Sequence, residues 1–424
     1  MYTNKKNIDI LQMKIAAFFL ALYIIYSSFF EHAIGKGISF FFLIISTIIV
    51  ILIIFKEKTI SFSRKGIGWW IILLFALYHN GFLLYSDFGT FFYFAYFLFI
   101  MVFAEKHTDF VLYFFRFAMY LSLLSAIVAV LCYFYPSLYS VIFSIYDGFV
   151  ANTDGGNYGY RAGLMPHTSW QGIVCSMGIL YDGTILILQN KRENYKKNII
   201  RLVRALVFLF ALILSAKRGP LLFVVMVLLI LYLFINRGKS FQKIIFLTMI
   251  GTFFLISFEY LVKILPGLSY MMGRFTNTND ISSLRFQFWK LALEQFYSHP
   301  FLGIGWLKYR YVFSKELFPY LNINRNFLYT DVHNVYIQIL CETGIFGIII
   351  YITTIYQAFM CSVRKVRISE KKQIISNKDK INILCLGIQV FYLLYSLTGN
   401  PLYDFTFIFY ALSCGLAYSK MEYE

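Results

Sequence analysis

One histidine stands at the junction between a long polar segment and an apolar run. We expect His333 at the mouth of a helix, where an imidazole, which titrates near neutral pH, can accept or donate a proton. Glu342 lies further along the same run, about 13 Å away on a straight helix. At that distance it is expected to hydrogen-bond a neighbouring helix rather than to orient His333. Gly344 and Gly347 would allow close packing of this helix.

Four basic residues are expected on the same side of the chain as this histidine: Arg161, Lys217, Arg218 and Arg285. Guanidinium groups present planar forks that match the geometry of phosphate, so the arginines could bind such a group. Arg218 lies between two apolar runs, where a charge is costly and a functional role is the default. Contact with lipid headgroups is the alternative for each arginine.

Composition predicts a membrane protein. The 424 residues are 59% hydrophobic, 21% aromatic and 14% charged, whereas a soluble domain carries roughly 25% charged residues. The apolar residues form runs close to the length that crosses a bilayer as a helix. The net charge of +17 is explained by basic residues retained on the cytoplasmic side, so no nucleic-acid partner is expected.

The predicted fold is all-α, with about twelve transmembrane helices and one large outer loop. The expected spans are 14–31, 38–55, 67–84, 88–104, 110–134, 168–188, 201–215, 219–235, 243–265, 334–357, 381–398 and 402–418. Lys and Arg concentrate in every second connection, such as 361–380, which places both termini in the cytoplasm. The first span resembles a signal peptide but is expected to be retained, because no small-residue cleavage site follows it.

Five regions follow from these spans. They are 1–134 with helices 1–5, the outer loop 135–167 that contains Arg161, 168–265 with helices 6–9, the large outer loop 266–333, and 334–424 with helices 10–12. In the large loop, 283–297 is expected to form a short aromatic helix that contains Trp289 and caps a cavity or lies in the membrane interface. The outer side has no D-x-D, H-E-x-x-H or carboxylate cluster, and the six cysteines have no pairing pattern. We therefore expect no metal, no cofactor and no disulfide framework.

Several segments resemble a known family. The pattern H-N-x-Y-x-x-x-x-x-E-x-G-x-x-G, from His333 and Asn334 to Gly347, is similar to the signature of the O-antigen polymerase and O-antigen ligase superfamily. Further similar elements occur in family order at 160–172 (Y-R-A-G-L-M-P-H-T-S-W-Q-G), 214–219 (L-S-A-K-R-G), 283–289 (S-L-R-F-Q-F-W) and 299–305 (H-P-F-L-G-I-G). Two positions depart from the family pattern: His167 replaces the usual Asn, and Lys217 the usual Ser. His167 could add a second titrating group or fill the same polar position, and we favour the latter.

The resemblance implies a membrane glycosyltransferase. Such an enzyme polymerises undecaprenyl-pyrophosphate-linked repeat units into O-antigen or capsular polysaccharide, on the outer face of the bacterial cytoplasmic membrane. The donor and the acceptor are both carrier-linked glycans, and a chain-length regulator and a flippase are expected partners. An O-antigen ligase, which transfers the glycan to lipid A core, is the alternative; a lipid-linked oligosaccharide flippase or another transporter is the second alternative.

The same resemblance implies roles for individual residues. His333 would be the general base. Arg161, Arg218 and Arg285 would bind the pyrophosphate and stabilise the negative charge that develops as it leaves. Supporting roles fall to Asn334, Glu342, His167 and Trp289.

The predicted sidedness can be tested by labelling. A cysteine introduced by Asn157→Cys or Asn279→Cys, each in an expected outer loop, should react in spheroplasts with a thiol reagent that does not cross membranes. Ser376→Cys, in an expected inner connection, should react only after the membrane is permeabilised. The protein without an added cysteine gives the background. Labelling of Ser376→Cys in sealed spheroplasts would invert the topology and move the predicted site to the cytoplasmic side.

Overall fold

In the structure, a computed structural model, the regular secondary structure of the described residues consists of helices. The structure describes residues 2–35, 37–57, 64–80, 85–146, 162–188, 195–235, 262, 269, 284–321, 329–370 and 376–420. Within these ranges no strand occurs. The chain divides into two compact units. The first unit comprises Met1–Ile60, His107–Thr278 and Ile368–Gly387, and the second comprises Ser61–Lys106, Asn279–Arg367 and Ile388–Glu424.

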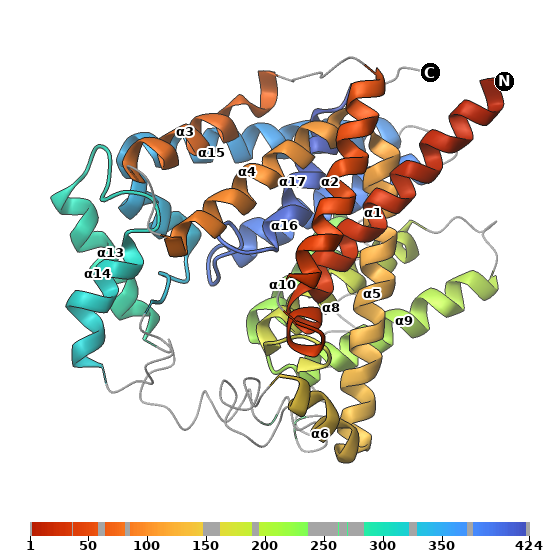
Figure 1. Cartoon of the computed structure of the whole chain (residues 1–424), viewed down its shortest axis with the longest axis horizontal. Helices are drawn as coiled ribbons and strands as arrows, with labels where there is room; N and C mark the ends of the chain where they lie inside the picture. Colours follow the sequence, from red (N-terminus) through yellow and green to blue (C-terminus); the bar gives the residue numbers. More distant parts are fainter. Residues whose placement is uncertain are drawn as a thin grey trace. The chain divides into compact units, whose positions relative to one another are not determined.

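The first unit is a bundle of apolar helices. Its helices are α1 (Tyr2–Ala33), α2 (Ile38–Glu57), α5 (Thr108–Phe134), α6 (Pro136–Ile145), α8 (Thr168–Ile187), α9 (Tyr195–Leu214) and α10 (Arg218–Phe234). In Figure 1, α1 lies along α2 and α5, and α8 packs against α5, α9 and α10. Helices form here because a backbone in lipid must satisfy its N–H and C=O groups internally.

The second unit contains both long apolar helices and several short helices and turns. It holds a 3₁₀ turn (Arg64–Gly66), α3 (Ile67–Asn80), α4 (Tyr85–Lys106), α13 (Arg285–Ser298), α14 (Tyr309–Val312), a π turn (Phe313–Leu317), a 3₁₀ turn (Phe318–Tyr320), most of α15 (Val335–Glu370), the end of α16 (Asn377–Tyr395) and α17 (Phe407–Tyr418). Helix α4 lies against α17. Trp69 is fully buried in its core, edge-on to Phe407 and Tyr410 at ring-centroid distances of 5.3 and 5.7 Å.

The structure bears out an all-helical membrane protein. Among the described residues, six helices are long and apolar enough to cross a bilayer: Asp9–Ala33, Ile38–Glu57, Gly89–Lys106, Thr108–Phe134, Thr168–Ile187 and Val335–Ser369. Helices α10 and α17 are apolar but shorter. The predicted span 243–265 lies outside the described residues, and every other predicted span overlaps a described helix. The total of about twelve spans and the large outer loop stay predictions.

Helix α15 is interrupted near its beginning. It has 36 residues, and Gly344 within it has a φ of 64° and a ψ of −164°, which are not helical. Thirty-six helical residues would extend about 54 Å, well beyond the roughly 30 Å hydrocarbon layer. The interruption thus separates a short first part, which ends before Gly344, from a second part that is long enough to cross the bilayer by itself.

The segment 300–305 fills this interruption. Four backbone hydrogen bonds join them: Ile304 N–H to Cys341 C=O (3.0 Å), Gly305 N–H to Glu342 C=O (2.9 Å), Ile345 N–H to Pro300 C=O (2.9 Å) and Phe346 N–H to Phe301 C=O (3.5 Å). A broken helix leaves N–H and C=O groups without intrahelical partners, and such groups are costly when they are buried. The segment supplies those partners, so the break and the segment form one backbone interlock.

Glycine is required on both sides of this interlock. A Cβ atom on Gly344 would clash with the carbonyl of Phe301, and one on Gly303, which has a φ of 72°, would clash with the backbone of Glu342. The sequence predicted only that Gly344 allows close helix packing. The structure gives this glycine a further role. It provides a backbone with positive φ and the space in which segment 300–305 lies.

Gly344→Ala should destabilise the protein. An L side chain at this positive φ with an extended ψ, a combination that essentially only glycine adopts, costs about 1–3 kcal/mol. Displacing the contacting backbone adds roughly 1–3 kcal/mol. We expect a clearly lower melting temperature in detergent, measured as the fraction of protein that still elutes as a folded peak in size-exclusion chromatography after heating. Gly89→Ala is the matched control, because a Cβ there meets no atom within 4 Å and Ala favours the helix. Equal melting temperatures for the two variants would contradict the interlock.

Candidate functional site

The turn that carries His333 is held on both sides. His333 itself has a φ of 57°, a left-handed conformation that is uncommon for a residue with a side chain. Before it, the Val332 N–H donates to Gln338 Oε1 (3.2 Å) and the Val332 C=O accepts from Trp289 Nε1 (3.1 Å). Backbone and side-chain contacts therefore fix the chain at the residue that precedes the histidine.

The residues after His333 are fixed as well. Asn334 Oδ1 accepts from the Ile337 N–H (3.1 Å), which caps the N-terminus of α15. The Asn334 side-chain amide also donates to the Leu397 C=O (3.2 Å), and the Val335 N–H donates to the Ser396 C=O (2.9 Å). Asn334, predicted as a supporting residue, thus joins the start of α15 to the end of α16.

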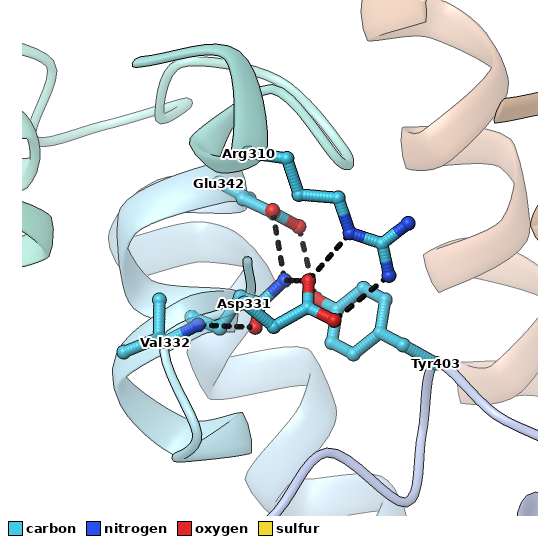
Figure 2. Close-up of polar contacts among 6 residues, drawn as sticks. Arg310, Asp331, Val332, Glu342 and Tyr403 are labelled. Atoms are coloured by element: carbon cyan, nitrogen blue, oxygen red, sulfur yellow. Dashed lines mark hydrogen bonds and ion pairs between the residues drawn. The ribbon is translucent and has the colours of Figure 1, made fainter. Parts of the chain in front are cut away.

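A polar network lies directly behind this turn (Figure 2). Arg310 binds the Asp331 carboxylate through two parallel hydrogen bonds, Nε to Oδ1 (2.7 Å) and Nη2 to Oδ2 (2.8 Å). Gln338 Nε2 donates to Asp331 Oδ1 (3.0 Å) and to Glu342 Oε1 (3.1 Å). Tyr403 donates to Glu342 Oε2 (2.9 Å). Two carboxylates, one guanidinium, one amide and one phenol are therefore joined in a continuous chain.

Charge pairing decides the ionisation of Asp331. Burial of its carboxyl group favours the neutral form, but the charge of Arg310 and the hydrogen bonds from Arg310 and Gln338 outweigh this, and they lower the pKa of Asp331 below its usual value. The same pairing raises the pKa of Arg310 despite its burial. Both groups are charged at neutral pH, as a bidentate pair requires.

Of the predicted residues in the second unit, Asn334 and Trp289 bond within or beside the turn of His333. The rings of Phe288 and His333 lie 6.2 Å apart, and Trp289 bonds to the residue before His333. Arg285 is half-buried and begins α13 one helical turn before Phe288. Glu342 was expected to hydrogen-bond a neighbouring helix. Its partner Tyr403 lies instead in the turn before α17.

The other predicted residues belong to the first unit. Arg218 is half-buried and is the first residue of α10. His167 is the N-cap of α8, where its Nδ1 accepts from the Ser169 N–H (3.0 Å). This is a role that the Asn of the family pattern could also fill. Arg161 lies outside the described residues.

The two family-like elements of the first unit contact each other. A Cβ on Gly172 would lie 3.3 Å from Lys217 Cβ, so segment 160–172 packs against segment 214–219. Gly163 has a φ of 56°, and a Cβ there would lie 2.5 Å from the Ser125 C=O. The backbone that follows position 161 is thus packed closely on α5.

Four residues of the network were missed from the sequence: Arg310, Asp331, Gln338 and Tyr403. A signal existed for two of them. Asp331 stands two residues before His333, and Gln338 and Glu342 are spaced to share one face of a helix. Arg310 and Tyr403 come from distant segments with no such spacing. Across the described ranges, no group of three or more His, Cys, Asp or Glu side chains could hold a metal ion.

A comparison with known families matches part of the chain. Residues 204–352 match the O-antigen ligase family. The match confirms the resemblance to the O-antigen polymerase and ligase superfamily that the sequence motifs predicted. It includes Arg218, Arg285, Asp331, His333 and Glu342, whereas Arg161 and His167 precede it. No curated protein matches this chain. This similarity, which covers residues 204–352, suggests a glycosyltransferase-like enzyme, either polymerase or ligase.

The network predicts a specific loss of stability. Gln338→Met keeps the volume of a fully buried side chain but removes its hydrogen bonds to Asp331, Glu342 and the Val332 N–H. Leaving buried polar partners unsatisfied costs about 1–3 kcal/mol for each group, so the melting temperature should fall markedly. Gln295→Met, which removes an exposed bond to Glu316, is the control and should change little. A small, equal effect of both substitutions would show that the network is not needed for folding.

Proposed function

We propose that this protein polymerises polyprenyl-pyrophosphate-linked oligosaccharide repeat units on the outer face of the cytoplasmic membrane. The observation that carries the proposal is His333 in a left-handed turn, fixed by its neighbours, inside the range that matches the O-antigen ligase family. Strained residues that the surrounding structure holds in place cluster at active sites. The resemblance supplies the substrate class.

The chemistry assigns a task to each group. An acceptor sugar hydroxyl attacks the anomeric carbon of the donor glycan, and the bond between that carbon and the pyrophosphate oxygen breaks. His333 takes the proton of the hydroxyl as the new glycosidic bond forms. The polyprenyl pyrophosphate leaves with the bonding electrons, and Arg161, Arg218 and Arg285 are proposed to stabilise its charge. Trp289 fixes the histidine turn, and the proposal gives it no direct contact with the sugar.

A ligase is the second candidate, because the matching family is described as O-antigen ligase. The two functions share the donor and differ only in the acceptor: a second carrier-linked repeat unit for the polymerase, and lipid A core for the ligase. Purified protein supplied with donor and each acceptor separately would distinguish them. Growth of a ladder without lipid A core supports the polymerase, and transfer only to lipid A core replaces it with the ligase.

His333→Ala should abolish transfer without loss of folded protein. The side chain is half-buried at the end of a helix, so its removal opens no large apolar cavity. Loss of a general base reduces rates by a factor of about 10² to 10⁴, which would remove long chains from a gel. The assay uses purified protein and lipid-linked repeat unit, and His32→Ala is the control. Normal chain growth in His333→Ala would overturn the assignment of the base. Movement of the substrate across liposomes without any transfer by the wild type would replace the enzyme with a flippase.

A further inference from the structure

The conformation of His333 needs a cause within the structure. A left-handed backbone at a residue with a side chain is energetically unfavourable relative to the right-handed region. The contacts of Val332 and Asn334 account for the path of the backbone. Two residues before His333, Asp331 forms a partly buried ion pair with Arg310. The proposed reaction gives this pair no role.

Arg310 is poorly placed to bind a substrate phosphate. Asp331 engages one edge of its guanidinium, through Nε (2.7 Å) and Nη2 (2.8 Å), in the bidentate geometry that a phosphate would otherwise occupy. Extracting it would leave Asp331 buried without its partner, which is strongly unfavourable. We therefore treat the pair as one unit. Its function is to hold neighbouring residues and not to bind an anion.

The pair is joined to the histidine turn through Gln338, whose side chain donates to Asp331 Oδ1 (3.0 Å) and accepts from the Val332 N–H (3.2 Å). The positive charge of a protonated His333 favours the ionised form of Asp331 and contributes to its lowered pKa. Such coupling is reciprocal, so an ionised Asp331 must favour the protonated form of His333 by the same free energy. A base that shares its neighbourhood with a fixed carboxylate has a higher affinity for the proton that it must accept.

Other charged groups also act near this turn. Arg310 on α14 and Glu342 on α15 belong to the network of Figure 2, and Arg285 begins α13, whose Phe288 and Trp289 approach the turn. Asp404, in the turn before α17, interacts electrostatically with Asp331. Of these groups, only Asp331 is both continuous with the histidine turn and held by two hydrogen bonds from a guanidinium.

We propose that Asp331, held by Arg310, is the positioning residue that orients His333 and sets its affinity for a proton. The pair fixes the carboxylate, the carboxylate fixes the turn, and its charge stabilises the imidazolium that forms when a hydroxyl proton is taken. This inference rests on the proposed function, because it assigns a partner to the proposed base. The titration of His333 can nevertheless be measured without any glycosyl transfer.

The test measures the pH at which His333 becomes reactive. Diethyl pyrocarbonate modifies neutral imidazole, and mass spectrometry of the peptide reports modification of His333 in the purified full-length protein at each pH. Asp331→Asn removes the anion, so the midpoint should fall by about one pH unit. Arg310→Gln removes the cation that offsets the anion, so the midpoint should rise. The exposed His299 is an internal reference whose midpoint should stay constant.

Opposite shifts are the signature of the proposal, because general damage to the fold would not produce them. Glu294→Gln, which removes a carboxylate from an exposed ion pair of the same unit, is the matched control and should leave the midpoint unchanged. If Asp331→Asn does not fold, the rise in Arg310→Gln decides alone. Unchanged midpoints, or shifts in the same direction, would overturn the proposal. If His333→Ala still transfers glycan, His333 is not the general base of the proposed reaction. The pH dependence of His333 modification in the Asp331 and Arg310 variants still tests this inference.

Discussion

The structure of the second unit depends on a helix that is broken inside a membrane protein. An uninterrupted α15 would satisfy its own backbone and would need no partner. Once Gly344 takes a left-handed conformation, the neighbouring N–H and C=O groups need external partners, and segment 300–305 supplies them. The two helices that flank this segment, α13 and α14, are thereby attached to α15. Helix α13 precedes it and reaches the histidine turn through Trp289, and α14 follows it and carries Arg310.

This arrangement explains why charged side chains are tolerated here. A buried ion pair often contributes little net stability, because desolvation offsets its attraction. Asp331 and Arg310 satisfy each other in two hydrogen bonds, and Gln338 extends the network to Glu342. The consequence is a fixed geometry rather than a large gain in stability. A rigid arrangement of this kind is what a catalytic base needs, since small displacements of a reacting group slow a reaction considerably.

Helices were predictable from the sequence and their connections were not. Apolar runs of membrane length locate α2, α5, α8 and α15, because burial in lipid requires both the length and the composition. The interruption between α9 and α10 was also expected, since Ser215–Pro220 places charges inside an apolar stretch, and the helices do end at Leu214 and begin again at Arg218. These features are local, and local composition is sufficient to predict them.

The site was only partly predictable. His333 and Asn334 stand out because a polar motif meets an apolar run, and the structure places them in a fixed turn with Trp289 beside them. Arg310 and Asp331 could not be paired from sequence, because 21 residues separate them and no periodic element joins them. The break at Gly344 also escaped, since a glycine in an apolar helix usually indicates close packing. Its left-handed conformation depends on a partner segment 40 residues away in the chain, which only the tertiary structure identifies.

Hydrogen exchange of the interlocked amides tests this account most directly. The N–H groups of Ile304 and Gly305 lie in a segment without regular secondary structure, yet they donate to Cys341 and Glu342. Exchange measured by mass spectrometry on the purified protein, over short peptides that cover 303–306, should therefore be slower than that of an unprotected amide by at least about a hundredfold. Exchange at the rate of an unprotected amide would show that the segment does not close the break in α15. The support assigned to Arg310, Asp331 and His333 would then be lost with it.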